Sequence, residues 1–299
     1  MGGREAVFYV GRVTKSGFEK EDFVNALLDP KPFTDNNNYV WNIVATNELE
    51  YDGIKYYYGK LNKANPNSTV KIMTNDYREE IEKDEPDMIL CTSEFIYIPI
   101  YSGIAFQSIP NSIEQKKFKD VFQNIIETTL GGFFVECKIN LIDDLVTFLK
   151  RLKQFDSIST IKVSVTPPNP MFGRFWESLR DYLQERNADK VLIKEISKQG
   201  KLISKLIELI EVLLRNEEKE IIEYLKLNKI SLADAGILMS MDGYGNGRID
   251  GKVGGEKLFI KTHERVLHFT VQKDINNEDV FIKANNIFKR INNERHMEH

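Results

Sequence analysis

The chain has 299 residues, of which 41% are hydrophobic and 29% are charged, and its formal net charge is −4. This composition can fill a core, which excludes intrinsic disorder and collagen-like or low-complexity structure. No run of 18 apolar residues predicts a membrane span, and the first residues lack the pattern of a secretory signal. The two cysteines, Cys91 and Cys137, are too far apart for a CxxC site or a disulfide framework, so we expect a reduced, soluble, cytoplasmic protein.

Charge is distributed unevenly along the sequence. Residues 1–130 carry a net charge of −6, whereas residues 131–299 carry +2. The basic residues are densest between positions 186 and 205, where the sequence has six Lys or Arg residues and only two acidic residues. They are Arg186, Lys190, Lys194, Lys198, Lys201 and Lys205. Such asymmetry is typical of a nucleic-acid-binding face, and it is equally compatible with an ordinary solvated surface.

Alternating and helical hydrophobic patterns predict the elements of the first half. The expected strands cover residues 6–14, 39–46, 54–61, 68–73, 88–100 and 104–109, and the expected helices lie around residues 18–27 and 113–130. Asp52-Gly53 is typical of a tight hairpin turn. Gly131-Gly132 ends the long helix, so we expect one domain over residues 1–130 and a second over residues 131–299.

The second half alternates strands and helices. The expected strands cover residues 133–139, 160–166, 190–196, 247–253, 257–261 and 266–271, and the expected helices cover residues 143–155, 172–183, 202–214, 217–227 and 278–291. The predicted fold class is α+β, with an antiparallel-sheet N-terminal domain and a β-α-β-type, layered C-terminal domain.

The most unusual segment has four glycines in the nine residues from Gly243 to Gly251. Glycine lets backbone amides approach a phosphate, and Arg248 and Lys252 can neutralise it. The segment is neither a Walker A loop nor a dinucleotide fingerprint, since Val253 replaces Ser/Thr and a hairpin follows. As a calcium loop it lacks the terminal bidentate Glu. A phosphate contact and a plain glycine turn both remain open.

No set of residues predicts a specific catalytic site. Glu136 and Lys138 form an E-x-K pair on one face of an expected strand, as in some metal-dependent nucleases, but no partner Asp is evident. His263 and His268 belong to no zinc or hydrolase motif. The tyrosines at positions 56–58, 97 and 101 lie in expected strands among aliphatic residues, and this pattern indicates a sheet core. We therefore assign no catalytic residue, metal ligand or cofactor.

The segment from Thr160 through Val165-Thr166-Pro167-Pro168-Asn169-Pro170 to the strand at 190–196, together with the opening strand Val7-Phe8-Tyr9-Val10, resembles an uncharacterised family of bacterial and phage proteins. In layout the chain is similar to the RexA-like phage-exclusion proteins. The resemblance implies a phage-defence protein, a homodimer that binds double-stranded DNA without sequence preference and acts with a partner effector protein. It implies no catalytic residue.

The sequence thus predicts a non-enzymatic, cytoplasmic protein that binds double-stranded DNA by neutralising its phosphates. The residues expected to do so are Arg186, Lys190, Lys194, Lys198, Lys201, Lys205, Arg248 and Lys252. Two alternatives stay open: a metal-dependent nuclease or nucleic-acid-targeting toxin using Glu136 and Lys138, and a protein–protein interaction module that binds through a sheet edge.

Overall fold

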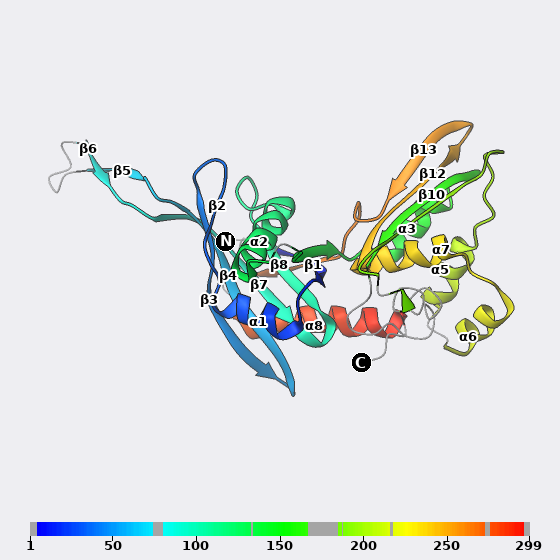
Figure 1. The fold of residues 1–299 in the computed structure, drawn as a ribbon, viewed down its shortest axis with the longest axis horizontal. Helices are drawn as coiled ribbons and strands as arrows, with labels where there is room; N and C mark the ends of the chain where they lie inside the picture. The colour runs from blue at the N-terminus through cyan, green and yellow to red at the C-terminus, as the bar shows by residue number, and fades with distance from the viewer. Residues whose placement is uncertain are drawn as a thin grey trace. The chain divides into compact units, whose positions relative to one another are not determined.

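The chain has an α+β fold, as the sequence predicts (Figure 1). The structure is a computed structural model that describes residues 5–73, 80–132, 134–166, 185–186, 188–215, 218–272 and 276–295. The helix expected at 172–183 and the Pro-rich segment before it lie outside the described residues. Within the described part of the chain, no helix combines the length and the apolarity that a membrane span requires.

The chain divides into two compact units that alternate along the sequence. Unit 1 consists of Met1–Thr14, Tyr97–Ala105 and Lys138–His299, and unit 2 consists of Lys15–Ile96 and Phe106–Cys137. The sequence predicts a single boundary near Gly131-Gly132, whereas unit 1 also contains two segments from before that point.

Unit 2 is an antiparallel sheet covered by two helices. Its elements are α1 (Lys20–Leu28), β2 (Phe33–Thr34), β3 (Val40–Tyr51), β4 (Ile54–Asn65), β5 (Thr69–Met73), β6 (Glu80–Asp84) and α2 (Gln115–Leu130), with the parts of β7 (Met88–Ile98), β8 (Gly103–Ser108) and β9 (Glu136–Leu141) that fall inside it. The strands run in the order β8-β7-β4-β3-β2, and β5 pairs separately with β6.

Aromatic packing and turn chemistry explain unit 2. Phe106 stacks on Phe118 of α2 with ring centroids 4.2 Å apart, and both side chains are fully buried. The hairpin expected at Asp52-Gly53 joins β3 to β4, where both residues have positive φ, as a type I′ turn requires. The expected tyrosine core is confirmed at Tyr56, where only 3% of the residue is exposed.

Unit 1 contains two sheets. In the first, β1 (Glu5–Ser16) lies between β14 (His268–Gln272) and β8, and β9 also pairs with β1. In the second, four strands run in the order β11-β10-β12-β13 and every pairing is antiparallel. These four strands are β10 (Ser157–Val165), β11 (Val191–Ile196), β12 (Gly245–Val253) and β13 (Glu256–Lys261).

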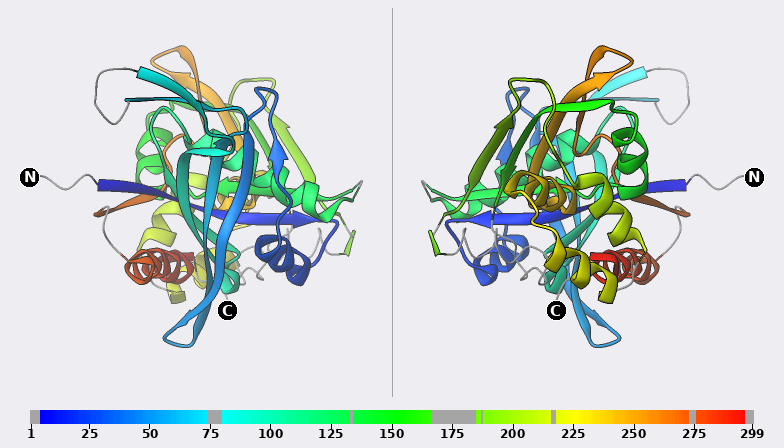
Figure 2. Two further views of the ribbon diagram at one scale, coloured as in Figure 1. Left: turned by 90° about the vertical axis from the view of Figure 1, so that its left-hand side faces the viewer. Right: turned by 90° about the vertical axis from the view of Figure 1, so that its right-hand side faces the viewer.

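Helices cover one face of the four-stranded sheet. The other elements that the structure describes in unit 1 are η1 (Pro99–Tyr101), α3 (Leu145–Leu152), α5 (Leu206–Leu214), α6 (Glu218–Leu227), α7 (Leu232–Met239), η3 (Ser240–Tyr244) and α8 (Asn277–Arg295). Helix α7 packs on β10, β11 and β12 (Figures 1 and 2). Gly236 allows this close approach, because a Cβ there would lie 2.6 Å from a methyl group of Val163.

A fully buried arginine ties distant segments of unit 1 together. The guanidinium of Arg12 on β1 donates to the carbonyl oxygens of Tyr101 and Asp242 and to Oδ1 of Asn292 on α8. It also lies over the rings of Tyr244 and Phe288, at 5.2 and 5.8 Å from their centroids. A buried cation is tolerated only when its donors are satisfied, so Arg12 specifies how these segments assemble.

The glycine-rich segment comprises the end of η3 and the strand β12, and it is not an exposed loop. Gly243 and Gly245 are buried, and a Cβ on Gly245 would lie 2.0 Å from the carbonyl oxygen of Ser164. A plain glycine turn is therefore wrong for Gly245 to Gly251, which lie in strand β12, and the buried Gly243 and Gly245 do not present their backbone amides to a phosphate. The exposed Asn246 and the half-exposed Arg248 belong to the regular strand β12.

Candidate nucleic-acid interface

The four-stranded sheet of unit 1 has one buried and one exposed face. On β10, Ile161, Val163 and Val165 are buried toward the helices, whereas Lys162 between them is exposed. The same alternation occurs on β11, where Lys194 is exposed. Since side chains of a strand alternate between faces, Lys162 and Lys194 share the face that the helices leave open.

Strand register places four cations side by side on this open face. Lys194 of β11 lies opposite Lys162 of β10. Lys162 in turn lies opposite Arg248 of β12, and Arg248 lies opposite Lys261 of β13. Neighbouring strands are about 4.8 Å apart, so this cation row extends over roughly 14 Å across the sheet.

Two further lysines extend the open face along the outer hairpin. Lys252 lies two strand periods beyond Arg248 on β12, and its partner in register is Lys257 of β13. Both are exposed. We call the six residues together the basic face: Lys162, Lys194, Arg248, Lys252, Lys257 and Lys261.

One arginine of the basic face is held in place by two neighbours. The Nε of Arg248 donates to Oδ1 of Asp250 at 2.9 Å, and the guanidinium carbon lies 4.1 Å from the ring centroid of Phe259. The hydrogen bond from Arg248 to Asp250 also raises the pKa of Arg248. Asp250 thus offsets part of the charge of Arg248, whereas the ring of Phe259 adds a cation–π interaction with the guanidinium.

The arrangement is unfavourable for stability on its own. Like charges directly opposite one another in a sheet repel, and here three consecutive neighbouring pairs carry the same sign. Solvent and salt screen these exposed pairs, so the cost is tolerable. A polyanion laid across the row would remove the repulsion.

The structure brings together only part of the basic set expected from the sequence. Lys194, Arg248 and Lys252 belong to the basic face. Lys190 is exposed directly before β11, Arg186 is exposed in the turn upstream, and Lys198 and Lys201 are exposed in the turn after β11.

Lys205 does not join the basic face. It precedes α5, its backbone amide donates to Asp234 of α7, and its Nζ donates to Asn228. These partners belong to the helical layer, on the buried side of the sheet. Burial raises the pKa of the Asp234 carboxyl, although hydrogen bonds from Ser204 and the Lys205 amide act in the opposite direction.

Three residues of the basic face were missed at the sequence level, namely Lys162, Lys257 and Lys261. For Lys162 a signal existed, because Ile161-Lys162-Val163-Ser164-Val165 alternates in the manner of a half-buried strand. The pairing that sets Lys162 between Lys194 and Arg248 is a tertiary fact, and no local pattern contains it.

Other polar groups have partners that suit structural roles. Asp143 accepts from the backbone amide of His263 at 2.7 Å, and the His263 ring nitrogen Nε2 lies 2.7 Å from the carbonyl oxygen of Gly245. These contacts anchor the turn that follows β13. Glu136 and Lys138 lie on β9 with the buried Cys137 between them. Across the described ranges, no group of three His, Cys, Asp or Glu is arranged to hold a metal ion.

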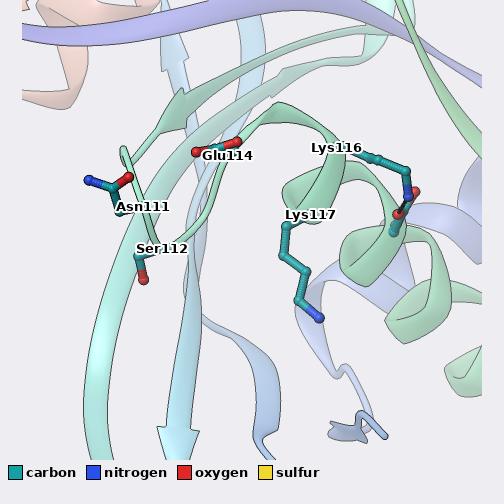
Figure 3. A pocket seen from close by; sticks show the side chains of 6 residues that line it. Asn111, Ser112, Glu114, Lys116 and Lys117 are labelled. Atoms are coloured by element: carbon teal, nitrogen blue, oxygen red, sulfur yellow. Dashed lines mark hydrogen bonds and ion pairs between the residues drawn. The ribbon is translucent and has the colours of Figure 1, made fainter. Parts of the chain in front are cut away.

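A pocket in unit 2 also contains lysines, but acids compensate them. It is lined by Asn111, Ser112, Glu114, Lys116, Lys117 and Asp120 around the start of α2 (Figure 3). Lys116 forms an ion pair with Asp120, and the Nζ of Lys117 lies 2.8 Å from Oδ2 of Asp35. Acidic side chains therefore balance the lysine charges at this pocket, whereas the basic face carries an excess of positive charge.

A family model described as a domain of unknown function (DUF4747) matches residues 29–220, which is more than half of the chain. The matched span includes β10 and β11 and ends before β12 and β13. No curated protein matches the chain.

Proposed function

The chain belongs to the DUF4747 family, and we propose that it binds the phosphate backbone of nucleic acid through the basic face without reading base sequence. The observation that carries this proposal is the cation row, in which Lys194, Lys162, Arg248 and Lys261 are consecutive cross-strand neighbours. Repulsion within the row is relieved by a ligand that carries regularly spaced negative charge, and nucleic acid is such a ligand.

The chemistry of the basic face supports a backbone contact. Lysine ammonium groups are point charges on flexible stems, so they follow phosphates without demanding one geometry. Phosphate contacts position a protein on nucleic acid and carry no sequence information. With a whole-chain charge of −4, the attraction is confined to this face and is not a property of the whole surface.

The resemblance to RexA-like proteins adds predictions that go beyond this chemistry. It predicts double-stranded DNA as the ligand, a homodimer, an effector partner and a role in phage defence. A duplex and a single strand both present phosphates, so the cation row by itself supports either ligand.

Charge reversal on the basic face tests the proposal. Lys162→Glu, Lys194→Glu and Lys261→Glu combined should weaken binding to unrelated oligonucleotides alike, by at least about tenfold at low salt. Six phosphate contacts predict a slope of log affinity against log salt of about −4 to −5, and losing three of them should reduce it by about 2 to 3. Fluorescence anisotropy titrations at several salt concentrations measure both quantities.

The matched control changes net charge equally but elsewhere. Lys20, Lys31 and Lys116 are exposed in unit 2, and their combined reversal to Glu should leave affinity and slope within about twofold of the wild type. Equal losses in both triple variants, or no binding by the wild type at low salt, would show that the basic face is not a nucleic-acid site.

A further inference from the structure

The basic face carries exposed apolar groups as well as charge. Phe259, between Lys257 and Lys261 on β13, is 44% exposed. On the opposite edge strand, Leu192 is 76% exposed and Ile196 is 56% exposed, on either side of Lys194. Register and alternation put all of them on the same face as the cation row.

A duplex leaves these apolar groups without a role. Its bases are stacked inside, so it offers phosphates and sugars to a flat surface, and Phe259, Leu192 and Ile196 would gain little contact. A single strand exposes the faces of its bases, which stack on aromatic rings and on guanidinium planes. Cations beside such stacking groups are what a protein uses to hold a single strand.

The Arg248–Phe259 pair has the form that base stacking needs. The guanidinium lies 4.1 Å from the ring centroid, and the Nζ of Lys261 lies 5.3 Å from the same centroid. The Nε of Arg248 donates a hydrogen bond to Asp250, which holds the guanidinium in this position before a ligand binds. A base can therefore extend a stack that already exists while the lysines contact the adjoining phosphates.

From this geometry we infer that the basic face selects single-stranded over double-stranded nucleic acid, with the Arg248–Phe259 stack as the platform for a base. This inference rests on the proposed function and differs from the double-stranded ligand that the resemblance predicts. Because stacking accepts every base, the preference for single strands is compatible with binding that ignores sequence.

The test compares probes that carry the same phosphates. The full-length protein is titrated with a labelled mixed-sequence 20-mer as single-stranded DNA and RNA, with its 20-base-pair DNA duplex, and with a 20-mer built entirely of abasic nucleotides. The single-stranded DNA or RNA should bind at least about tenfold more tightly than the duplex and the abasic strand.

Variants at Phe259 separate stacking from charge. Phe259→Ala should weaken single-strand binding about tenfold, because one base loses its platform, and should leave duplex and abasic binding and the salt slope nearly unchanged. Phe259→Trp should keep the affinity. Phe259→Leu preserves apolar packing but has no aromatic face, so it should behave as Phe259→Ala does even if the alanine variant is unstable.

Phe134→Ala is the matched control, since Phe134 in unit 2 is 90% exposed, and it should change nothing. Duplex binding as tight as single-strand binding, with Phe259→Leu unaffected, would overturn the inference while the proposed function stands. Failure of every probe to bind at low salt would overturn both.

Discussion

At the scale of single residues, the burial of Lys15 and Cys137 in unit 2 makes the stability of the folded protein depend on pH. Burial lowers the pKa of Lys15 to about 8, although the charge of nearby Cys137 acts in the opposite direction. Burial raises the pKa of the Cys137 thiol well above its usual range, and Lys15 opposes that change. The two groups therefore respond to pH with opposite signs.

For Lys15, the unfolded chain binds more protons than the folded protein between pH 8 and about 10.4, so this group makes stability rise with pH in that window. For Cys137, the folded thiol keeps its proton after the unfolded thiol has lost it above about pH 8.5, so this group makes stability fall. In the wild type the two slopes partly cancel.

Lys15→Met should remove the rising contribution. The free energy of unfolding of the variant minus that of the wild type should be largest at pH 7. At pH 10 this difference should be smaller by at least about 1 kcal/mol, because one pKa unit corresponds to about 1.4 kcal/mol. Urea unfolding at pH 7, 8.5 and 10 measures this difference. Cys137→Ala is the control with the opposite sign, and parallel curves for all three proteins would contradict the prediction.

At the scale of elements, β12 depends on glycines because other segments of the chain pass too close for a side chain. A Cβ at Gly245 would lie 2.0 Å from a backbone oxygen, and backbone cannot retreat as a side-chain tip does. Gly254, in the turn between β12 and β13, has φ +59 and no neighbour within 4 Å. The two glycines therefore have different reasons to be glycine.

Gly245→Ala should destabilise the protein by about 2 kcal/mol or more through overpacking. Gly254→Asn should stay within about 0.5 kcal/mol of the wild type, since asparagine tolerates the left-handed conformation at a surface turn. Thermal and urea unfolding of both variants check the contrast. Equal effects at the two sites would mean that the close approach at Gly245 relaxes without cost.

Most elements were predictable because their patterns are local. Alternation identified β1, β10 and β11, and the Gly254-Gly255 turn identified the β12–β13 hairpin. Helix α7 was missed because its small and apolar residues show no helical periodicity. Its N-cap is Ser231, whose side chain accepts a hydrogen bond from the backbone amide of Asp234. Strand β6 was missed because Glu80, Glu82 and Asp84 leave it without an apolar face.

The candidate site was predictable only in part, for a physical reason. The local density of lysines pointed to β11 and its flanks, yet Lys205 belongs to the helical layer and Lys162 was overlooked. Which cations meet depends on which strands pair, and those pairings join positions up to about 90 residues apart, as between Lys162 and Arg248. The spacing of residues along the sequence does not show which strands pair.

At the scale of the whole molecule, neither half of the sequence is a complete unit. Unit 1 requires Met1–Thr14 and Tyr97–Ala105 in addition to Lys138–His299. From β1 it takes the buried side chains of Phe8, Val10 and Arg12. A fragment cut at the Gly131-Gly132 boundary therefore lacks part of its own core.

A fragment of residues 131–299 should not unfold cooperatively, because it exposes the surface that β1 covers. The control replaces residues 69–84 by a short Gly-Ser turn. This change removes the paired strands β5 and β6, and every described residue of β6 is exposed. The control should keep a cooperative transition. Near-UV circular dichroism and thermal scans distinguish the two outcomes, and a sharp transition in the fragment would refute the interleaved organisation.

The contacts of Arg12 have a consequence for biosynthesis. Its acceptors on Asp242 and Asn292 are 230 and 280 positions further along the chain. At about 5–20 residues per second, the ribosome needs on the order of tens of seconds to deliver the last of them. During that interval the nascent strand β1 carries a cation and apolar side chains that have no native partners, whereas the segments of unit 2 are complete much earlier. We expect the emerging N-terminus to be the part of this protein that relies most on chaperones.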